Sequence, residues 1–311
     1  MPKTREDAPM SIAEGPINLD TPEGPAPKRL PSRRRVLAAS MFTVGYAAAI
    51  RPVNAQAITT DAAGLTIEEV KIPAFGGYAL PAYVARPAGK TKAPAVIVVN
   101  EIFGVHAYIK DVCRRLAKLG YLAVAPDYFD RAGDPSVLSD MAAIRPIVEK
   151  AGQQQVLGDT GAIVAWLQKH KAADAQKIGI TGFCWGGNVV WMAAAKTPGI
   201  KAGVAWYGRL KKPAQPMFSG AADQFPLDVV GEIKAPVLGL YGGKDQGIPV
   251  ADVEAMRAAL AAAGNPQKCE IVLYPEAQHG FHADFRPSYD KSSAMDGWAR
   301  LEAWFKTHGV V

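Results

Sequence analysis

Hydrophobic residues are concentrated in short uninterrupted runs along this chain. Residues 94–100 are rich in β-branched side chains and apolar on both faces, a pattern typical of a central strand covered by helices on each side. Similar runs predict further strands at 121–126, 177–181, 202–207, 235–241 and 269–274. Ahead of them, residues 68–73 and 79–86 are joined by a Gly-Gly turn and predict an opening β-hairpin.

Most of the stretches between these strands read as helices. The expected helices are 107–119, 136–150, 153–169, 188–195, 250–263 and 288–308. Strands that alternate with helices predict one α/β domain over residues 58–311, with a mostly parallel, doubly wound sheet and helices on both faces. Ligands of such sheets bind beyond the carboxyl ends of the strands. Because Glu101, Cys184, Asp245 and His279 each follow a different predicted strand, we expect them to meet at one edge.

One glycine-rich stretch, residues 182–187 (GFCWGG), lies between a predicted strand and a predicted helix. A nucleophile on a sharp strand-to-helix turn needs glycine on both sides, because flanking Cβ atoms would clash where strand and helix pack closely. The pattern is a nucleophile elbow with Cys184 in the place of serine. The N-terminus of the following helix favours a thiolate and a developing oxyanion. The alternative interpretation is a buried structural cysteine in a glycine-rich turn.

Nucleophilic acyl transfer also needs a base and a group that orients the base. Cys184, Asp245 and His279 follow one another in the nucleophile–acid–histidine order of α/β-hydrolases. Asp245 could alternatively cap the next helix. Glu101 directly follows a buried strand, where a charge needs a partner, although a solvated loop carboxylate is the alternative.

Taken together, these motifs resemble the dienelactone hydrolase family, the carboxymethylenebutenolidases, from about residue 66 to the C-terminus. The matching motifs are NEIFG at 100–104, APD at 125–127, the elbow at 182–187, GKD at 243–245 followed by Ile-Pro at 248–249, and HGF at 279–281. The resemblance implies an α/β-hydrolase fold with Cys184 as nucleophile, His279 as base and Asp245 as its orienter. It further implies that Glu101 is an auxiliary carboxylate, which helps to generate the thiolate when substrate binds.

The resemblance also implies the reaction. A thiolate attacks a small lactone or activated ester, a thioester forms, and water cleaves it, while the backbone N–H groups of Ile102 and Trp185 form the oxyanion hole. Family members bind a substrate carboxylate with arginines, but here Ala283 stands where one would be expected four residues after the histidine. The remaining candidates for anion binding, each of which could instead be a solvated surface charge, are Arg145, Arg209 and Arg286.

The N-terminal region is typical of a targeting signal rather than of part of the folded domain. Residues 1–31 are rich in Pro, Gly and charge and should be disordered. Residues 32–37 (SRRRVL) precede an Ala-rich apolar run to about residue 50 and an A-x-A site that ends at Ala57. This pattern predicts a twin-arginine export signal over 1–57 and a periplasmic or secreted mature chain from Ile58. A surface helix or an uncleaved membrane anchor is the alternative, although the run is short for a membrane span.

Charge and cysteine content narrow the function further. The net charge is +6, but only 27 basic and 24 acidic residues remain after residue 57. This small excess of positive charge argues against a nucleic-acid-binding protein. Three cysteines without metal-type spacing argue against a disulfide framework and a zinc site. We therefore expect no cofactor, a small-molecule substrate and a monomer or weak dimer. One alternative function is a thiol redox or peroxide-handling protein that uses Cys184, although this chain has no second cysteine near Cys184 in the sequence to resolve the oxidised form. The other is a non-catalytic binding module of hydrolase ancestry.

Overall fold

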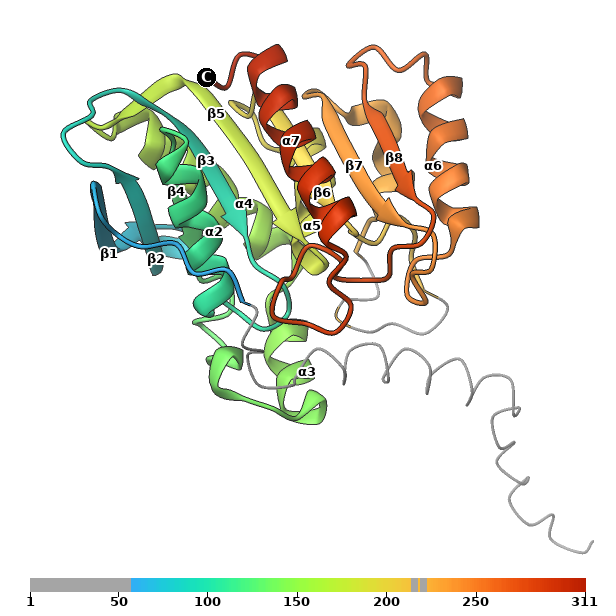
Figure 1. The fold of residues 1–311 in the computed structure, drawn as a ribbon, viewed down its shortest axis with the longest axis horizontal. Coiled ribbons are helices and arrows are strands. Elements are labelled where there is room, and N and C mark those ends of the chain that lie inside the picture. The colour runs from blue at the N-terminus through green and yellow to red at the C-terminus, as the bar shows by residue number, and fades with distance from the viewer. Residues whose placement is uncertain (1–56, 214–217, 219–222) are drawn as a thin grey trace, which may run out of the picture.

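An eight-stranded sheet runs through the computed structural model, which describes residues 57–213, 218 and 223–311 (Figure 1). Its strands are β1 (Leu65–Pro73), β2 (Ala79–Pro87), β3 (Ala93–Val99), β4 (Leu122–Pro126), β5 (Ala173–Phe183), β6 (Ala202–Trp206), β7 (Val237–Gly242) and β8 (Glu270–Tyr274). The spatial order is β1-β2-β4-β3-β5-β6-β7-β8. β2 pairs antiparallel with both β1 and β4, and every other neighbouring pair is parallel. The predicted opening hairpin and mostly parallel sheet are confirmed.

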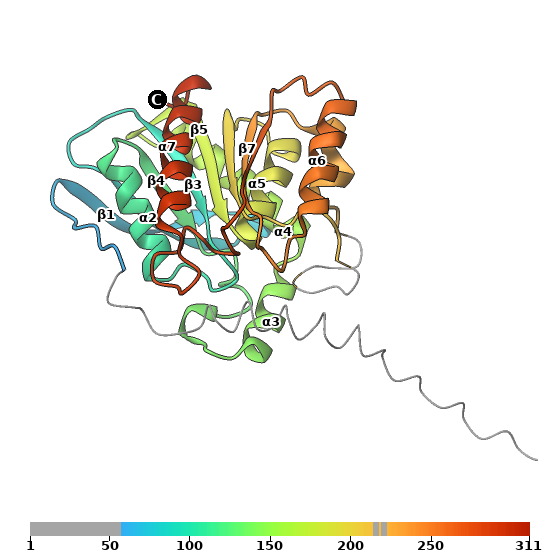
Figure 2. The same ribbon diagram turned by 45° about the vertical axis from the view of Figure 1, so that its right-hand side comes forward.

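Helices cover both faces of the sheet, as the alternating pattern predicted. They are α2 (Ala107–Lys118), α3 (Met141–Lys150), α4 (Gln153–Lys169), α5 (Trp185–Lys196), α6 (Val250–Ala262) and α7 (Lys291–Thr307), with short 3-10 turns η2 (Phe75–Gly77), η3 (Pro135–Val137) and η4 (Pro226–Glu232). In Figures 1 and 2, α2 and α7 lie on one face, and α4 and α5 lie on the other. α2 packs on β2 and β4, α7 on β6 and β7, and α5 on β5 and β6.

The centre of the sheet is fully enclosed. Every residue of β3 is buried, as is every residue of β6 and β7, which is why these strands read as continuous apolar runs. Thr181 is a buried polar residue of β5: its hydroxyl donates to the Val204 carbonyl at 3.0 Å and accepts from the Trp206 indole at 3.1 Å. Its buried polar atom is therefore satisfied.

The predicted helix at 136–150 is shorter and begins later than expected. Asp134 caps η3, and Asp140 caps α3 by accepting from the backbone N–H of Ala142 at 3.0 Å. Aspartate side chains that bind the N–H two residues ahead compete with helix continuation and favour a new helix start. This stretch is therefore split into a 3-10 turn, an extended link and a helix.

The predicted N-terminal signal lies outside the described residues apart from Ala57. Within the part of the chain that the structure describes, no helix combines the length and the apolar character needed to cross a bilayer.

Candidate active site

Cys184 lies on a strained turn between β5 and α5. Its backbone has φ 57° and ψ −114°, a combination that non-glycine residues adopt only where the surrounding structure enforces it. The approach of strand and helix explains the glycines: a Cβ on Gly182 would lie 2.4 Å from the Gly186 carbonyl oxygen, and one on Gly187 would lie 2.5 Å from that of Trp206. The side chain is 3% exposed and lies directly before the first turn of α5.

The tight contact at the elbow leads to a stability prediction. A Cβ on Gly186 would lie 2.5 Å from the Val99 carbonyl oxygen and 2.6 Å from that of Asn100. Because these are backbone atoms, we expect Gly186→Ala to destabilise the protein by at least about 1–3 kcal/mol. Gly161→Ala in α4 is the matched control, since its Cβ meets nothing within 4 Å, and it should stabilise by about 0.5–1 kcal/mol. Urea unfolding measures both, and equal stabilities of the two variants would contradict the close approach.

His279 connects Asp245 with the cysteine. Its Nδ1 lies 2.7 Å from Asp245 Oδ2, and its ring interacts electrostatically with Cys184, which lines the same pocket. The other oxygen of Asp245 accepts from the backbone N–H groups of Gly247 at 2.7 Å and Ile248 at 3.1 Å. The N-cap of α6 is Pro249, so Asp245 is held by the turn after β7 and does not cap the helix.

The pKa of His279 reflects these neighbours. Burial opposes the charged imidazolium, but attraction by Asp245, to which it is hydrogen-bonded, and by Cys184 raises its pKa above the usual value. His279 also lies edge-on to the ring of Tyr207, with the ring centroids 5.2 Å apart. An imidazolium beside a cysteine is the arrangement that stabilises a thiolate.

This pKa predicts how stability depends on pH. The pKa of His279 rises from 6.5 to about 10 on folding, so the folded state holds the proton more tightly. The resulting stabilisation is complete below about pH 6.5 and is lost as the pH rises towards about 10. We expect the difference in Tm between the wild type and His279→Gln to shrink across that range in thermal unfolding. A difference that stays constant from pH 6.5 to 10 would contradict an ion-paired imidazolium.

Glu101 is fully buried two residues after the end of β3, and its Oε2 lies 2.5 Å from an Arg286 nitrogen and 3.8 Å from His106 Nε2. Burial alone would raise the pKa of this carboxyl. Attraction by Arg286, His106 and His279 outweighs burial and holds the pKa below its usual value. Glu101 is therefore a buried, ionised carboxylate, and its interpretation as a solvated loop residue is wrong.

Arg286 is likewise not a solvated surface charge. It is 5% exposed, and its guanidinium lies 5.0 Å from the ring centroid of Phe103 and 5.1 Å from that of Phe285. The chain after His279 turns twice, with hydrogen bonds from Ala283 N–H to the Gly280 carbonyl and from Arg286 N–H to the Ala283 carbonyl. These turns bring Arg286 back to the sheet edge, which the sequence pattern did not reveal.

The other two candidate arginines differ in position. Arg145 is an exposed residue of α3 that pairs with Glu149 one turn on, at 2.7 Å. Arg209 follows β6, and its carbonyl accepts from Asn188 at 2.9 Å. It lines the same pocket as Cys184, whereas Arg145 is not among the described residues that line it. Of the three, Arg209 alone lies where it could meet a ligand beside the cysteine.

The pocket has a reactive end and an apolar wall. Its lining includes Cys184 and His279 together with Ile102 and Trp185. The apolar wall is formed largely by Val156, Leu157, Val189, Met192, Phe225 and Ile248. Such a pocket fits a small, mainly apolar molecule with one polar reacting group.

Sequence reasoning missed Tyr207. Its ring is fully buried, it lines the pocket, and its hydroxyl has no hydrogen-bond partner among the described residues. Like Cys184, it comes immediately after its strand, and its place at the carboxyl end of the predicted strand 202–207 was the available signal. Among the described residues, no cluster of three or more His, Cys, Asp or Glu could hold a metal ion.

Comparison with known proteins gives concordant matches. The model of the dienelactone hydrolase family matches residues 80–309. A protein from Methylorubrum extorquens, named "Putative carboxymethylenebutenolidase", is 52% identical over 90% of this chain and 94% of its own. A Bradyrhizobium protein named "Probable 2-oxo-3-(5-oxofuran-2-ylidene)propanoate lactonase" is 35% identical, over 73% of this chain and 89% of its own. A crystal structure titled as a putative dienelactone hydrolase from Klebsiella pneumoniae has 47% identity and a TM-score of 0.73, covering 78% of this chain and 98% of that one.

Proposed function

Because this chain belongs to the dienelactone hydrolase family, we propose that it cleaves small lactones or carboxylic esters through a thioester on Cys184. The observation that carries the proposal is the position of His279, which bonds Asp245 and lines one pocket with Cys184. Membership of this family of α/β-hydrolases supports hydrolysis as the reaction type. The identity of the nucleophile rests on the geometry of these three residues.

The first half of the proposed reaction forms the thioester. The Cys184 thiolate attacks the carbonyl carbon of the substrate, and the oxyanion that develops accepts hydrogen bonds from the backbone N–H groups of Ile102 and Trp185, two residues of the pocket lining. The tetrahedral intermediate then collapses, the carbon–oxygen bond breaks, and the imidazolium of His279 gives its proton to the leaving alkoxide or enolate. In a lactone this step opens the ring, and the new hydroxyl group stays on the enzyme because it belongs to the acyl group bound to Cys184.

The second half releases the acid. Neutral His279, oriented by Asp245 at 2.7 Å, takes a proton from water, and the hydroxide attacks the thioester carbonyl. The carbon–sulfur bond breaks, which regenerates the thiolate and the imidazolium. Asp245 fixes the tautomer and orientation of the ring and stabilises its charge.

We assign Glu101 a supporting role at the same site. One of its oxygens is occupied by Arg286, while Oε1 is buried with no hydrogen-bond partner among the described residues. In this role the carboxylate would interact with the Cys184 thiol when substrate is bound. The family resemblance supports this role, because it assigns the matching glutamate to thiolate formation.

Alkylation tests the proposed nucleophile on the purified wild-type protein, with aryl esters and enol lactones as substrates. We expect iodoacetamide to modify Cys184 alone. Cys113 is fully buried, with its pKa raised by burial, and burial raises the pKa of Cys269 to about 11. Peptide mass spectrometry and residual activity should therefore change in parallel, one equivalent accompanying complete loss. Full activity after stoichiometric alkylation of Cys184 would contradict the proposal, as would peroxide consumption without ester cleavage.

We also propose that residues 1–57 are a twin-arginine export signal. The basic residues, the short apolar run and the A-x-A site that ends at Ala57 support this. The mature enzyme would then act in the periplasm or outside the cell. N-terminal sequencing of protein from the periplasmic fraction tests the proposal, which a chain that still begins at Met1 would contradict.

A further inference from the structure

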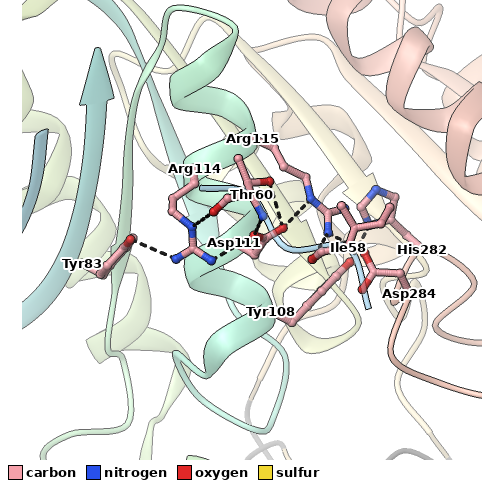
Figure 3. A network of polar contacts seen from close by, with 9 residues as sticks. All are labelled: Ile58, Thr60, Tyr83, Tyr108, Asp111, Arg114, Arg115, His282 and Asp284. Atoms are coloured by element: carbon pink, nitrogen blue, oxygen red, sulfur yellow. Dashed lines mark hydrogen bonds and ion pairs between the residues drawn. The ribbon is translucent and has the colours of Figure 1, made fainter. Parts of the chain in front are cut away.

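A network of charged groups fixes the start of the described chain to helix α2 (Figure 3). Asp111 accepts from the backbone N–H of Thr60 at 2.6 Å, from Arg114 at 2.9 Å and from Arg115 at 2.6 Å. Arg114 also donates to the Thr60 carbonyl at 2.8 Å. Residues near 60 are therefore held on α2 by backbone and side-chain bonds at a sequence separation of about fifty residues.

The same network reaches the turn that follows His279. Arg115 donates to Asp284 Oδ2 at 2.5 Å and to the Ile58 carbonyl at 3.4 Å (Figure 3). Asp284 is 4% exposed. Burial raises the pKa of its carboxyl, and the Arg115 guanidinium, with a smaller contribution from the backbone of Ile58, opposes that rise. Because Ile58 and Asp284 bind the same guanidinium, the backbone of Ile58 lies beside a buried carboxylate.

Ile58 is the first residue after the predicted cleavage site. Ile58 directly follows the A-x-A site that ends at Ala57, where a peptidase selective for small residues would cut. Ile58 is 50% exposed, so this stretch of the chain lies at the surface. The position of the cut matters, because cleavage one residue earlier or later would move the new terminus by about 3.3–3.8 Å.

We propose that the α-ammonium group of Ile58, released by cleavage after Ala57, forms an ion pair with Asp284 and fixes the turn that carries Arg286. A signal-type endopeptidase adds one water molecule across the Ala57–Ile58 bond, leaving a carboxylate on Ala57 and an amine on Ile58. The amine takes up a proton, since the pKa of an α-amino group is about 7.7–8.0. One neutral N–H donor of the precursor thereby becomes a positively charged group with three donors.

The proposed ion pair has a defined structural effect. Asp284 lies two residues before Arg286, within the turns that run from Gly280 to Arg286. On the other side of this turn, Tyr108 of α2 bonds His282 Nδ1 at 2.5 Å. A charged N-terminus would therefore tighten a segment that is already tied to α2 and that supplies Arg286 to Glu101. Cleavage after Ala57 would then also fix the turn that carries Arg286.

Three wild-type chains test the proposal: one that begins at Ile58 with a free amine, the same chain acetylated at that amine, and one that begins at Ala57. We expect the free-amine chain to have a Tm about 2–4 °C above both others, the shift that one modest ion pair gives in a protein of this size. We also expect it to resist trimming by an aminopeptidase, followed by intact mass. Equal Tm values and equal trimming rates would overturn the proposal.

Asp284→Asn is the matched variant. In this background the three chains should have the same Tm, because the amide carries no charge to pair with the amine. A difference that persists in Asp284→Asn would also overturn the assignment to Asp284. If this variant does not fold, the comparison of the three wild-type chains still decides. None of these readouts depends on ester cleavage, so the outcome is independent of the chemistry proposed for Cys184.

Discussion

Replacing Cys184 by alanine is expected to lower kcat/KM for aryl esters and enol lactones by about 10⁴-fold or more, because removal of a covalent nucleophile leaves only binding and oxyanion stabilisation. The residue follows β5 on a strained turn and lines one pocket with His279. Steady-state kinetics with a chromogenic ester measures the loss.

Cys113→Ala is the control for this prediction. Cys113 is buried in α2 and is not among the residues that line the pocket. Its loss should reduce stability but leave kcat/KM within a few-fold of the wild type. If Cys184→Ala retained a tenth of the wild-type activity or more, another group would have to be the nucleophile.

The second large effect concerns stability. Arg286→Ala would leave the fully buried Glu101 carboxylate without its closest charged partner, which lies at 2.5 Å. Breaking a buried ion pair from one side costs about 3–5 kcal/mol, because the remaining charge is desolvated and uncompensated. We expect a loss of this size in the free energy of unfolding from urea titration at pH 7.

Two comparisons separate this effect from a general packing defect. The double variant Glu101→Gln with Arg286→Ala should recover part of the loss, because it buries no charge. The deficit of Arg286→Ala should also shrink as the pH falls below about 5. Ionised Glu101 contributes stability above its unfolded pKa near 4.5, and that contribution disappears once the carboxyl is protonated.

Arg145→Ala provides the surface reference. Its pair with Glu149 is exposed, and such pairs contribute at most about 1 kcal/mol. A loss for Arg286→Ala no larger than the loss for Arg145→Ala would contradict the buried pair.

Much of the fold could be predicted from the pattern of apolar residues, because the layered packing of helices on the sheet determines which positions are buried. Strands such as β3 are buried on both faces and therefore read as continuous apolar runs, which placed the sheet and most helices within a few residues. Local capping decided the exceptions: Asp140 starts α3 later than predicted, and the helix after the elbow begins at Trp185 rather than near residue 188.

The candidate site was only partly predictable. Residues that directly follow strands could be found, because parallel strands place their carboxyl ends at one edge. The pairing of Arg286 with Glu101 could not be found this way, since Arg286 returns to the sheet edge through turns whose path depends on hydrogen bonds between Gly280, Ala283 and Arg286. The solvated interpretation of Glu101 was wrong because its partner was hidden by that same path.

The thioester on Cys184 can be observed directly. The wild-type protein is mixed with a slowly hydrolysed ester, quenched in acid within the first turnovers and examined by intact and peptide mass spectrometry. The account predicts a mass increase equal to the acyl group, located on the peptide that contains Cys184 and removed by hydroxylamine. A burst of alcohol release with no adduct on that peptide, or with the adduct on another residue, would contradict it.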